Sequence, residues 1–471
     1  MSLSASDQRR WEQEQPVLEQ ARKEHPELFV PIKKSTGELL KRVGIFSAQS
    51  DRPVGYVKYS PLDFIVEEIR PSGEVVTVDG PTASPEFVDG VGTIYVDLVK
   101  VGISTLDAVE RMAEGLHIEK KHLGYAGIKD NVALTSQRLS LRTVSLAQVE
   151  QLTIENCVLK NILERKGAIQ VGNLLGNRFT LFIRTNGKID EHALSRQIDQ
   201  IKEKGIMNYY GVQRFGSPRF LSHVFGLYLL RGDYEGCVKA VLTQASEFDL
   251  PFYQEKRANV AKHFGDWQTM KELFSQLPFA YRHELQIIDS LIAKPNDFLE
   301  ALHAVGDQAS MWARAYGSYL VNMFLSEAET EGSTLPEELP LLLGSDLQAD
   351  NLYGKWLKTH HVTSYRRVMR ECRFLQVGKN PTIEPVLRPV FHHYQVLDEG
   401  VALSFDLQKG AYATTVLEWL FEVVTGTPVP EWLSRNDMDT KQLLGTGDLT
   451  QIKTQLATAL ANAMSSKGQE E

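Results

Sequence analysis

The sequence is poor in cysteine, with only Cys157, Cys237 and Cys372 among 471 residues. The three lie far apart and form no CxxC pair, which argues against a disulfide framework and against a cysteine-rich zinc site. Long apolar runs are also lacking, since no stretch approaches the roughly 20 apolar residues that span a bilayer. The first 15 residues contain no apolar core of a secretion signal. We therefore expect a cytoplasmic protein with no membrane partner.

Signatures of metal and nucleotide binding are missing as well. The sequence has no P-loop and no convincing GxGxxG motif. Two histidine pairs, His360-His361 and His392-His393, superficially resemble metal ligands. Adjacent side chains diverge on a helix or strand, however, and no third ligand has a convincing spacing, whereas a metal site needs three or four convergent ligands. We interpret both pairs as surface or structural residues and predict no metal.

A net charge of −9 is awkward for a nucleic-acid-binding protein, because phosphate contacts need lysine and arginine. The charges are unevenly distributed along the chain. Residues 327–350 hold seven acidic and no basic residues, whereas residues 111–142 hold six basic and three acidic ones. An acidic lobe remote from a basic cleft would reconcile these facts, and ordinary scattered surface charge fits the composition equally well.

The length of the chain suggests two or three domains. Strands and helices are mixed up to about residue 220, helices dominate after it, and strand patterns return at 390–406. This order predicts an α+β catalytic domain interrupted by an inserted helix-rich domain, because insertion at a surface loop is physically cheap. We expect an N-terminal helical extension (1–45), a first catalytic part (46–233), the inserted domain (234–388), a second catalytic part (389–435) and a C-terminal tail (436–471).

Hydrophobic periodicity and turn residues predict the individual elements. In the polar residues 5–45 we expect one or two helices interrupted at Pro16 and Pro26, and we expect a loop at Pro85 and 90–92. Strands are expected at 54–69 (two, joined at Pro61), 93–101, 133–141 and 176–185. Helices are expected at 104–117, 145–150, 190–203, 225–245 and 311–328, the last with a wide apolar face typical of core packing.

The stretch His122–Ser140, HLGYAGIKDNVALTSQRLS, combines features that are typical of a site. Gly124 and Gly127 let the backbone turn tightly or approach a ligand closely. They deliver Asp130 beside the cation of Lys129, in a segment too apolar for a solvated loop. A carboxylate in that setting is either part of a structural ion pair or a positioned nucleophile or base.

Three further segments accompany this stretch: KYSPLDFIVEE (58–68), GIMNYYGVQRFG (205–216) and KGAYATTV (409–416). Together the four segments resemble the signature motifs of the TruD family of pseudouridine synthases, and they occur in the family order. The resemblance covers about residues 50–420 and leaves both ends unmatched. It implies a pseudouridine-synthase-like catalytic domain with a mixed, mainly antiparallel sheet, and the family's inserted, helix-rich α/β TRUD domain.

The resemblance also implies a catalytic pair. Asp130, in the GxKD motif, matches the single catalytic aspartate of the family, and Lys58 matches a basic residue at the start of the KxxPxDF motif. A cation beside the aspartate keeps the carboxylate ionised and oriented. Without the resemblance, Lys58 would be interpreted as a surface lysine on a strand.

Four more residues match the family's uridine pocket: Phe64, Asn208, Tyr210 and, from the last motif, Tyr412. A flipped uracil needs aromatic stacking on its faces and an amide at its edge, which these residue types supply. Tyr210 and Tyr412 stand where phenylalanine is common in the family, a difference that keeps the stacking and adds a hydroxyl. Arg214, in the same motif as Tyr210, either pairs with a phosphate or holds the backbone of the site.

Conversion of uridine to its C-glycoside requires that the N-glycosidic bond break, the base turn and C5 join C1′. A carboxylate promotes this by adding covalently to the ribose or the base, or by stabilising and deprotonating an electron-deficient sugar. The sequence leaves this choice open, and the chemistry needs no cofactor. The resemblance implies RNA, usually tRNA at uridine 13, as the partner, and no obligate protein partner is evident.

Two other functions fit parts of the sequence. An RNA-binding or RNA-folding module without essential catalysis is one, although intact Lys58, Asp130 and Asn208 argue against lost activity. A hydrolytic N-glycosidase using the same aspartate is the other, and it would need a second acid and a water-activating base. Glu67 and Glu68 are the nearest candidates, and alternation along a strand predicts that only one of them points inward. Free uracil as the product would identify the glycosidase.

Overall fold

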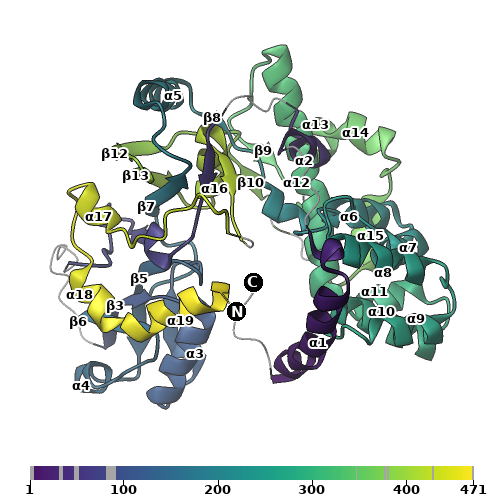
Figure 1. The fold of residues 1–471 in the computed structure, drawn as a ribbon, viewed down its shortest axis with the longest axis horizontal. Helices are drawn as coiled ribbons and strands as arrows, with labels where there is room; N and C mark the ends of the chain where they lie inside the picture. Colours follow the sequence, from purple (N-terminus) through teal and green to yellow (C-terminus); the bar gives the residue numbers. More distant parts are fainter. Residues whose placement is uncertain are drawn as a thin grey trace. The chain divides into compact units, whose positions relative to one another are not determined.

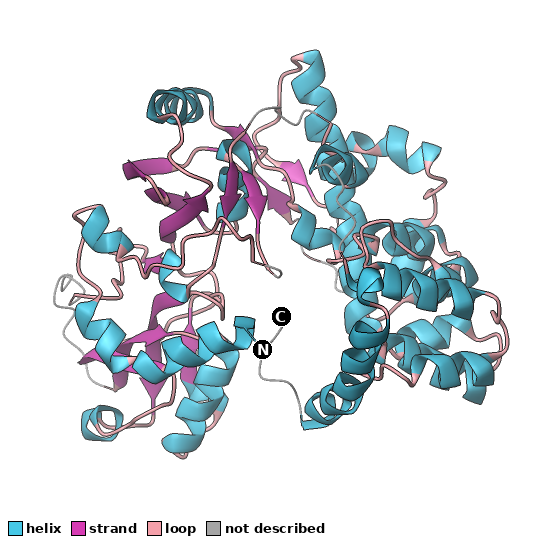
Figure 2. Ribbon diagram, viewed as in Figure 1, coloured by secondary structure: helices cyan, strands magenta, loops and turns pink. Residues whose placement is uncertain are grey.

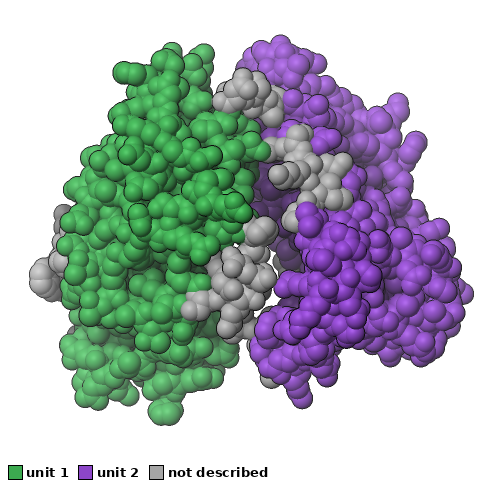
Figure 3. Space-filling view, viewed as in Figure 1, with its two compact units in different colours: residues 1–2, 50–206, 387–471 green, residues 3–49, 207–386 purple. Residues whose placement is uncertain are grey.

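The computed structural model describes residues 5–30, 36–46, 52–80, 92–345, 347–375, 378, 381–426 and 429–468. The chain forms two compact units, coloured separately in Figure 3. The described residues of unit 1 lie within 50–206 and 387–471, and those of unit 2 lie within 3–49 and 207–386. The long strands belong to unit 1, whereas unit 2 is built mainly of helices (Figure 2). The chain passes from unit 1 into the helical part of unit 2 between residues 206 and 207, earlier than the expected boundary at 233.

Unit 1 contains a ten-stranded sheet whose main path runs β12-β13-β7-β2-β5-β3-β6 (Figure 1). β1 pairs with β7 and β14, and β4 pairs with β5. The pairs β1–β14 and β2–β5 are parallel and the others are antiparallel, so the expected α+β class with a mixed, mainly antiparallel sheet is confirmed. The strands are β1 (Val54–Tyr56), β2 (Phe64–Ile69), β3 (Thr93–Lys100), β4 (Leu123–Tyr125), β5 (Leu134–Arg142), β6 (Cys157–Arg165), β7 (Gly176–Thr185), β12 (Val390–Leu397), β13 (Gly400–Gln408) and β14 (Glu422–Val424).

Helices pack on both faces of this sheet, because successive side chains of a strand point to opposite faces. Ile94, Val96 and Leu98 of β3 share one core with α3 and α4, whereas Val99 belongs to a second core with α18 and α19. Ser104 caps α3 as predicted, since its Oγ accepts the Asp107 N–H at 3.1 Å. The helices of unit 1 are α3 (Thr105–Gly115), α4 (Leu146–Glu150), α5 (Glu191–Lys204), α16 (Ala413–Leu420), α17 (Thr440–Leu443), α18 (Thr450–Gln455) and α19 (Ala457–Gly468).

β2 lies in the middle of the sheet, and both of its faces are buried. Phe64 and Val66 face a core that contains α5 and α16, and Ile65 faces the core of α18 and α19. Glu67 and Glu68 are therefore both buried, each 1% exposed. The prediction that only one of them points inward was wrong, because it assumed a strand with one solvated face.

The C-terminal tail, which matched no motif, supplies part of this second core. Leu449, Ile452 and Leu456 are buried against the sheet. Lys441 is 3% exposed, and its Nζ lies 2.6 Å from Glu67 Oε1 and 2.6 Å from Asp79 Oδ1. The buried carboxylate of β2 is thus neutralised by a cation from the other end of the chain.

Replacing Lys441 with Met is expected to lower the free energy of unfolding by about 3–5 kcal/mol, because it leaves the buried carboxylate of Glu67 and the half-buried carboxylate of Asp79 without their cation. Burial raises the pKa of Asp79, but the charge and hydrogen bond of Lys441 outweigh it and hold that pKa below its usual value. Ionised Asp79 therefore contributes its full stabilisation of the native protein above the ordinary pKa of an aspartate. This stabilisation is lost as the pH falls through the lowered pKa of Asp79. Chemical denaturation at several pH values measures both effects.

The matched control is Lys453→Met, which removes an ion pair with Asp437 whose carboxylate is 60% exposed. An exposed pair contributes at most about 1 kcal/mol, so this variant should unfold nearly as the native protein does. Equal destabilisation by the two substitutions would contradict the structural role of Lys441.

Unit 2 is organised around the long helix α12, which packs along α6. The two backbones approach so closely that a Cβ at Gly226 would lie 2.0 Å from the Trp312 carbonyl oxygen. The predicted apolar face of 311–328 is core packing, as expected, with Trp312, Tyr316 and Leu320 buried. The helices of the unit are α1 (Ala5–Glu24), α2 (Thr36–Arg42), α6 (Ser222–Arg231), α7 (Tyr234–Thr243), α8 (Pro251–Ala261), α9 (Trp267–Phe274), α10 (Arg282–Ala293), α11 (Phe298–His303), α12 (Gly306–Glu331), α13 (Gln348–Leu352), α14 (Gly354–Thr359) and α15 (Tyr365–Glu371).

Short strands complete the molecule. β9 (Leu339–Pro340) pairs with β10 (Thr382–Ile383) in unit 2. β8 (Ile206–Met207) pairs with β11 (Val386–Leu387), and the chain passes from one unit to the other within these two strands. None of the helices in the described residues is both long enough and apolar enough to cross a membrane.

The polar N-terminal segment forms more continuous helix than its prolines predict. Pro16 lies inside α1 without ending it, so the predicted interruption there was wrong, whereas the interruption at Pro26 is confirmed. Glu14 anchors α1 in unit 2, because its carboxylate accepts the N–H groups of Phe279 and Ala280 at 2.9 and 3.0 Å. The loop predicted at Pro85 and 90–92 lies almost entirely outside the described residues.

Candidate active site

The loop between β4 and β5 carries Asp130, and side chains of unit 1 hold this loop in place. Thr105 Oγ1 accepts the Lys129 N–H at 2.9 Å and donates to Gln137 Oε1 at 2.9 Å. The amide nitrogen of Gln137 in turn donates to the Gly127 carbonyl at 3.0 Å. These three residues are buried or half-buried, so water does not compete strongly for the bonds. The loop is therefore a rigid support for its carboxylate.

The two glycines of the motif differ in what they do. A Cβ at Gly124 would lie 2.3 Å from the Ile169 carbonyl oxygen and 2.6 Å from Ser140 Oγ, so close packing requires glycine there. At Gly127 the nearest atoms would be 3.8 Å away, an ordinary contact. Gly124 is thus required for close packing within the protein, which leaves the expected approach to a ligand a prediction, and no steric need for glycine is seen at Gly127.

Asp130 lies opposite Lys58, and the Lys58 ammonium donates to Asp130 Oδ2. The other carboxylate oxygen accepts the Val132 N–H at 3.1 Å. Burial raises the pKa of Asp130, but the charge and hydrogen bond of Lys58, with smaller help from Val132 and Lys100, lower it below the usual value. The carboxylate is therefore ionised at neutral pH, and its side chain is still 32% exposed and accessible to a substrate.

The Lys58 ammonium contacts an aromatic ring as well as Asp130. Its ammonium lies 4.3 Å from the centre of the Phe64 ring, within range of a cation–π interaction. The backbone of Lys58 has φ +60°, the left-handed region that non-glycine residues seldom adopt. Such a conformation costs about 1–3 kcal/mol and is concentrated at functional sites. The structure thus brings Lys58, Phe64 and Asp130 together from segments 72 residues apart in the chain.

Lys129, the neighbour of Asp130 in the sequence, has other partners. Its Nζ lies 3.0 Å from Glu68 Oε2 and donates to Asn177 Oδ1 at 2.7 Å. Glu67 and Glu68 are thus engaged with Lys441 and Lys129. This arrangement disfavours either glutamate as the second acid of a hydrolytic glycosidase.

Lys100 is a residue of the site that the sequence analysis missed. It is fully buried at the end of β3, and its Nζ donates to the Asp130 carbonyl at 2.8 Å and to the Ile103 carbonyl at 2.9 Å. Burial lowers the pKa of this ammonium to about 8. The sequence does contain a signal that Lys100 is buried. The apolar series Ile94, Val96 and Leu98 recurs at every second residue of the strand, and position 100 is the next one in that series.

Replacing Lys100 with Met is expected to lower kcat about 10- to 100-fold with little change in KM, because a misplaced carboxylate loses reaction geometry and not substrate contacts. The acid limb of the pH–rate profile should also move to higher pH, since the Lys100 charge helps to lower the pKa of Asp130. Lys160→Met is the control, because Lys160 of β6 also donates to a backbone carbonyl, that of Gly80, away from the loop. A purely structural Lys100 would leave the pH profile in place.

The other predicted residues are divided between the two units. Tyr412 belongs to unit 1, where it precedes α16 and is 53% exposed. Asn208 and Tyr210 belong to unit 2 and are 5% and 8% exposed. The Asn208 amide donates to the Glu384 carbonyl at 2.8 Å, and Asn322 Oδ1 accepts the Tyr210 N–H at 2.8 Å.

The histidine pairs take part in ordinary polar contacts. His360 Nδ1 lies 2.9 Å from the Tyr316 hydroxyl, and His392 Nε2 lies 2.9 Å from Asp406 Oδ2. Within the part of the chain that the structure describes, no three histidine, cysteine or acidic side chains are grouped so that they could hold a metal ion.

Comparisons with known proteins agree on one family. The family model TruD, described as tRNA pseudouridine synthase D, matches residues 43–341. A Methanocaldococcus jannaschii protein named "Probable tRNA pseudouridine synthase D 1" is 30% identical over 387 residues, which cover 78% of this chain and 95% of that protein. A Methanopyrus kandleri protein named "Probable tRNA pseudouridine synthase D" is 31% identical, covering 72% of this chain and 88% of that protein.

A solved structure is similar in fold. The crystal structure of a Methanosarcina mazei protein titled "Putative tRNA pseudouridine synthase D (TruD)" superposes with a TM-score of 0.64. The two chains are 22% identical, and the match covers 82% of this chain and 98% of the other.

Proposed function

The chain belongs to the TruD family, and from this premise we propose that it is a tRNA pseudouridine synthase of the cytoplasm that isomerises a uridine with Asp130 as the catalytic residue. The observation that carries the proposal is the arrangement of Asp130, Lys58 and Phe64 on a rigid support. An ionised, partly exposed carboxylate beside a cation and an aromatic face is suited to attack on a nucleoside or to stabilisation of a sugar cation.

The proposed reaction conserves the atoms of the nucleotide. The N1–C1′ bond breaks, the base turns while it remains bound, and C5 joins C1′. The proton on C5 leaves to solvent, and N1 takes up a proton in its place. Asp130 acts by covalent addition or by stabilising the positive charge at C1′, and Lys58 keeps it ionised for either role. No redox step occurs, so this chemistry requires no cofactor.

The uridine-binding residues that we propose are Phe64, Asn208, Tyr210 and Tyr412. Phe64 already lies beside the catalytic pair, and the half-exposed ring of Tyr412 is available for stacking on a base. The Asn208 side chain is held by a backbone carbonyl of its own unit, which orients its amide oxygen as an acceptor. A base must leave its stack before side chains of this kind can contact its faces and its edge.

The target that we propose is uridine 13 of tRNA, the usual target of the family. The test uses unmodified tRNA transcripts that carry 5-tritiated uridine, because tritium is released only when C5 forms its new bond. The native protein should release tritium without free uracil, and mapping of the pseudouridine should place it at position 13. Release of free uracil would instead identify an N-glycosidase, and tight binding without release would identify an RNA-binding module.

A further inference from the structure

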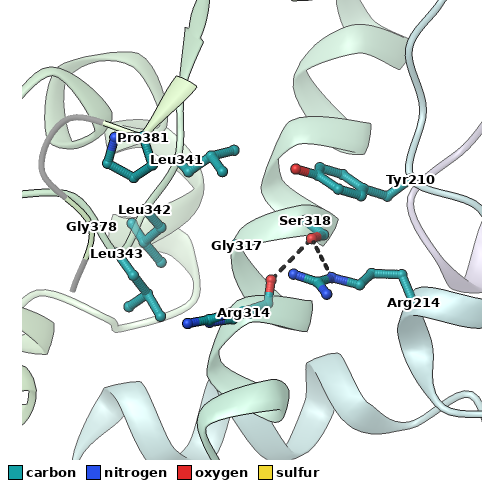
Figure 4. A pocket seen from close by; sticks show the side chains of 10 residues that line it. All are labelled: Tyr210, Arg214, Arg314, Gly317, Ser318, Leu341, Leu342, Leu343, Gly378 and Pro381. Carbon is teal, nitrogen blue, oxygen red and sulfur yellow. Dashed lines mark hydrogen bonds between the residues drawn. The ribbon is translucent and has the colours of Figure 1, made fainter. Parts of the chain in front are cut away.

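Each unit has an arginine that is associated with a sequence motif, and the two arginines differ in what they can reach. In unit 2, Arg214 lines a cavity of about 230 Å³, where its Nε donates to Ser318 Oγ at 3.2 Å (Figure 4). In unit 1, Arg184 of β7 is fully buried. A side chain that solvent does not reach cannot touch RNA. Arg184 can therefore influence the site only through other residues of the protein.

The Arg184 guanidinium forms a paired contact with Asp63, which belongs to the motif KYSPLDFIVEE. Its Nε donates to Asp63 Oδ2 and its Nη2 donates to Asp63 Oδ1, each at 2.8 Å. Both side chains are 0% exposed, and such a pair fixes orientation as well as distance. Asp63 Oδ2 also accepts the Ser60 N–H at 3.1 Å. The pair is thus bonded to the short turn that separates Lys58 from Phe64.

Two aromatic rings flank the same guanidinium. The central carbon of the Arg184 guanidinium lies 4.7 Å from the centre of the Tyr59 ring and 5.4 Å from the centre of the Phe182 ring, within range of cation–π interactions. Tyr59 directly follows Lys58, whose backbone has the strained φ of +60°. A conformation of this kind persists only where surrounding contacts determine it. The contact between Tyr59 and Arg184 supplies one such constraint beside Lys58.

The remaining nitrogen of Arg184 binds a segment beyond the last sequence motif. Its Nη1 donates to the Ser434 carbonyl at 2.7 Å, so each guanidinium nitrogen has a protein acceptor. The C-terminal part of the chain also holds the residue before Lys58, because the Val57 N–H donates to the Val424 carbonyl at 2.9 Å. The backbone is therefore held on both sides of Lys58.

We propose that Arg184 is a positioning residue for the uridine isomerisation, because it holds the segment 58–64 in the shape that keeps the Lys58 ammonium on Asp130. The inference rests on the proposed function, since Lys58 matters to the reaction through the ionisation of Asp130. Without the paired contact and the ring contacts, the strained backbone of Lys58 can relax, and its ammonium then leaves the carboxylate. Arg184 touches neither the substrate nor the reacting atoms, so it is not itself a catalytic residue.

The first test replaces Arg184 with Lys in the full-length protein and measures tritium release from tRNA as a function of pH. Lysine keeps a positive charge for the buried Asp63, but an ammonium can neither form the paired contact nor lie flat on a ring. We expect kcat to be about tenfold lower with little change in KM, because geometry and not substrate contact is lost. The acid limb of kcat/KM should move to higher pH, since a displaced Lys58 lowers the pKa of Asp130 less.

The matched control is Arg178→Lys. Arg178 lies on the same strand and forms the same kind of paired contact, with Asp406, at 2.8 and 3.0 Å. This pair joins β7 to β13 and not to the segment that carries Lys58. The kcat and the acid limb of this control should match those of the native protein. An acid limb that stays in the native position in Arg184→Lys, or that moves equally in both variants, would overturn the proposal.

A double variant separates positioning from stability. Arg184→Met with Asp63→Leu removes both charges together, so no buried charge is left unpaired and the fold should be retained, which thermal unfolding measures. If the pair only stabilised the fold, the folded double variant would have the native acid limb, and that result would overturn the proposal. A positioning role predicts that its acid limb stays at higher pH than the native one, because the contacts that shape the segment are still missing.

A measurement that does not depend on activity separates the two possible failures. In the native protein the Lys58 side chain is 19% exposed and paired with Asp130, so reductive methylation of its amine should be slow. Mass spectrometry should show faster methylation of Lys58 in Arg184→Lys. Tritium release by the native protein, with an unchanged acid limb and unchanged methylation in the variant, would reject the positioning role alone. Absence of release by the native protein would reject the proposed function, and the methylation rate would still show whether Arg184 holds Lys58.

Discussion

Replacing Asp130 with Asn is expected to lower tritium release from tRNA by about 10⁴-fold or more, with Kd for tRNA unchanged. An amide is a poor nucleophile and carries no negative charge, so it can neither add to the nucleoside nor stabilise a cation at C1′. Asn still has an oxygen that accepts the Val132 N–H, and the site is partly exposed, so the loop should keep its shape.

The matched control for this variant is Asp199→Asn. Asp199 lies on α5 in the same unit, and its side chain is 69% exposed, so the substitution changes the charge equally without touching the site. Single-turnover tritium release with excess protein measures the chemical step directly. Equal rates for Asp130→Asn and Asp199→Asn would remove Asp130 from the mechanism, whereas free uracil from the native protein would change the reaction class.

The second large effect is expected for Lys58→Met, which should lower kcat about 100-fold at neutral pH and still more in acid. In the native protein the cation outweighs burial and keeps the pKa of Asp130 below its usual value. Without the cation, burial dominates and raises that pKa, so the active carboxylate form is lost at a higher pH. The acid limb of the rate profile should therefore move to higher pH, and it is measured as kcat/KM between about pH 3 and pH 8, a range that includes the usual aspartate pKa of about 3.9.

Lys58→Arg serves as the rescue variant, because arginine restores a cation within reach of the carboxylate and of the Phe64 ring. The acid limb of the pH–rate profile of Lys58→Arg should return toward the native position. The kcat of this variant should stay below the native value, since the geometry of a guanidinium differs from that of an ammonium. An acid limb that stays in the native position in Lys58→Met would show that another group controls the ionisation of Asp130.

Much of unit 1 follows from local sequence signals. The alternation of Ile94, Val96 and Leu98 is sufficient to predict β3, and a serine before an apolar periodic run is sufficient to predict the start of α3 at Ser104. These predictions depend on neighbours within one turn or one strand. They succeed because local propensity and burial agree in this part of the chain.

Other features depend on segments that are distant in sequence, and local patterns do not predict them. Both Glu67 and Glu68 are buried because cations from elsewhere, Lys441 and Lys129, balance their charges. Pro16 continues a helix because α1 is held in unit 2 by tertiary contacts of Glu14, which outweigh a local helix-breaking tendency.

The sequence by itself determined the family, the α+β class and the identity of the candidate carboxylate, since motifs such as GxKD preserve residue types at a fixed spacing. The family resemblance implied Lys58 as the cation beside that carboxylate, but the spacing of charges along the chain did not, and only the tertiary structure shows the contact. Lys129 is adjacent to Asp130 in the chain but pairs with Glu68, whereas Lys58 reaches it from 72 residues away. The physical reason is that charge pairing and burial depend on distances in space, which chain folding sets and sequence separation does not.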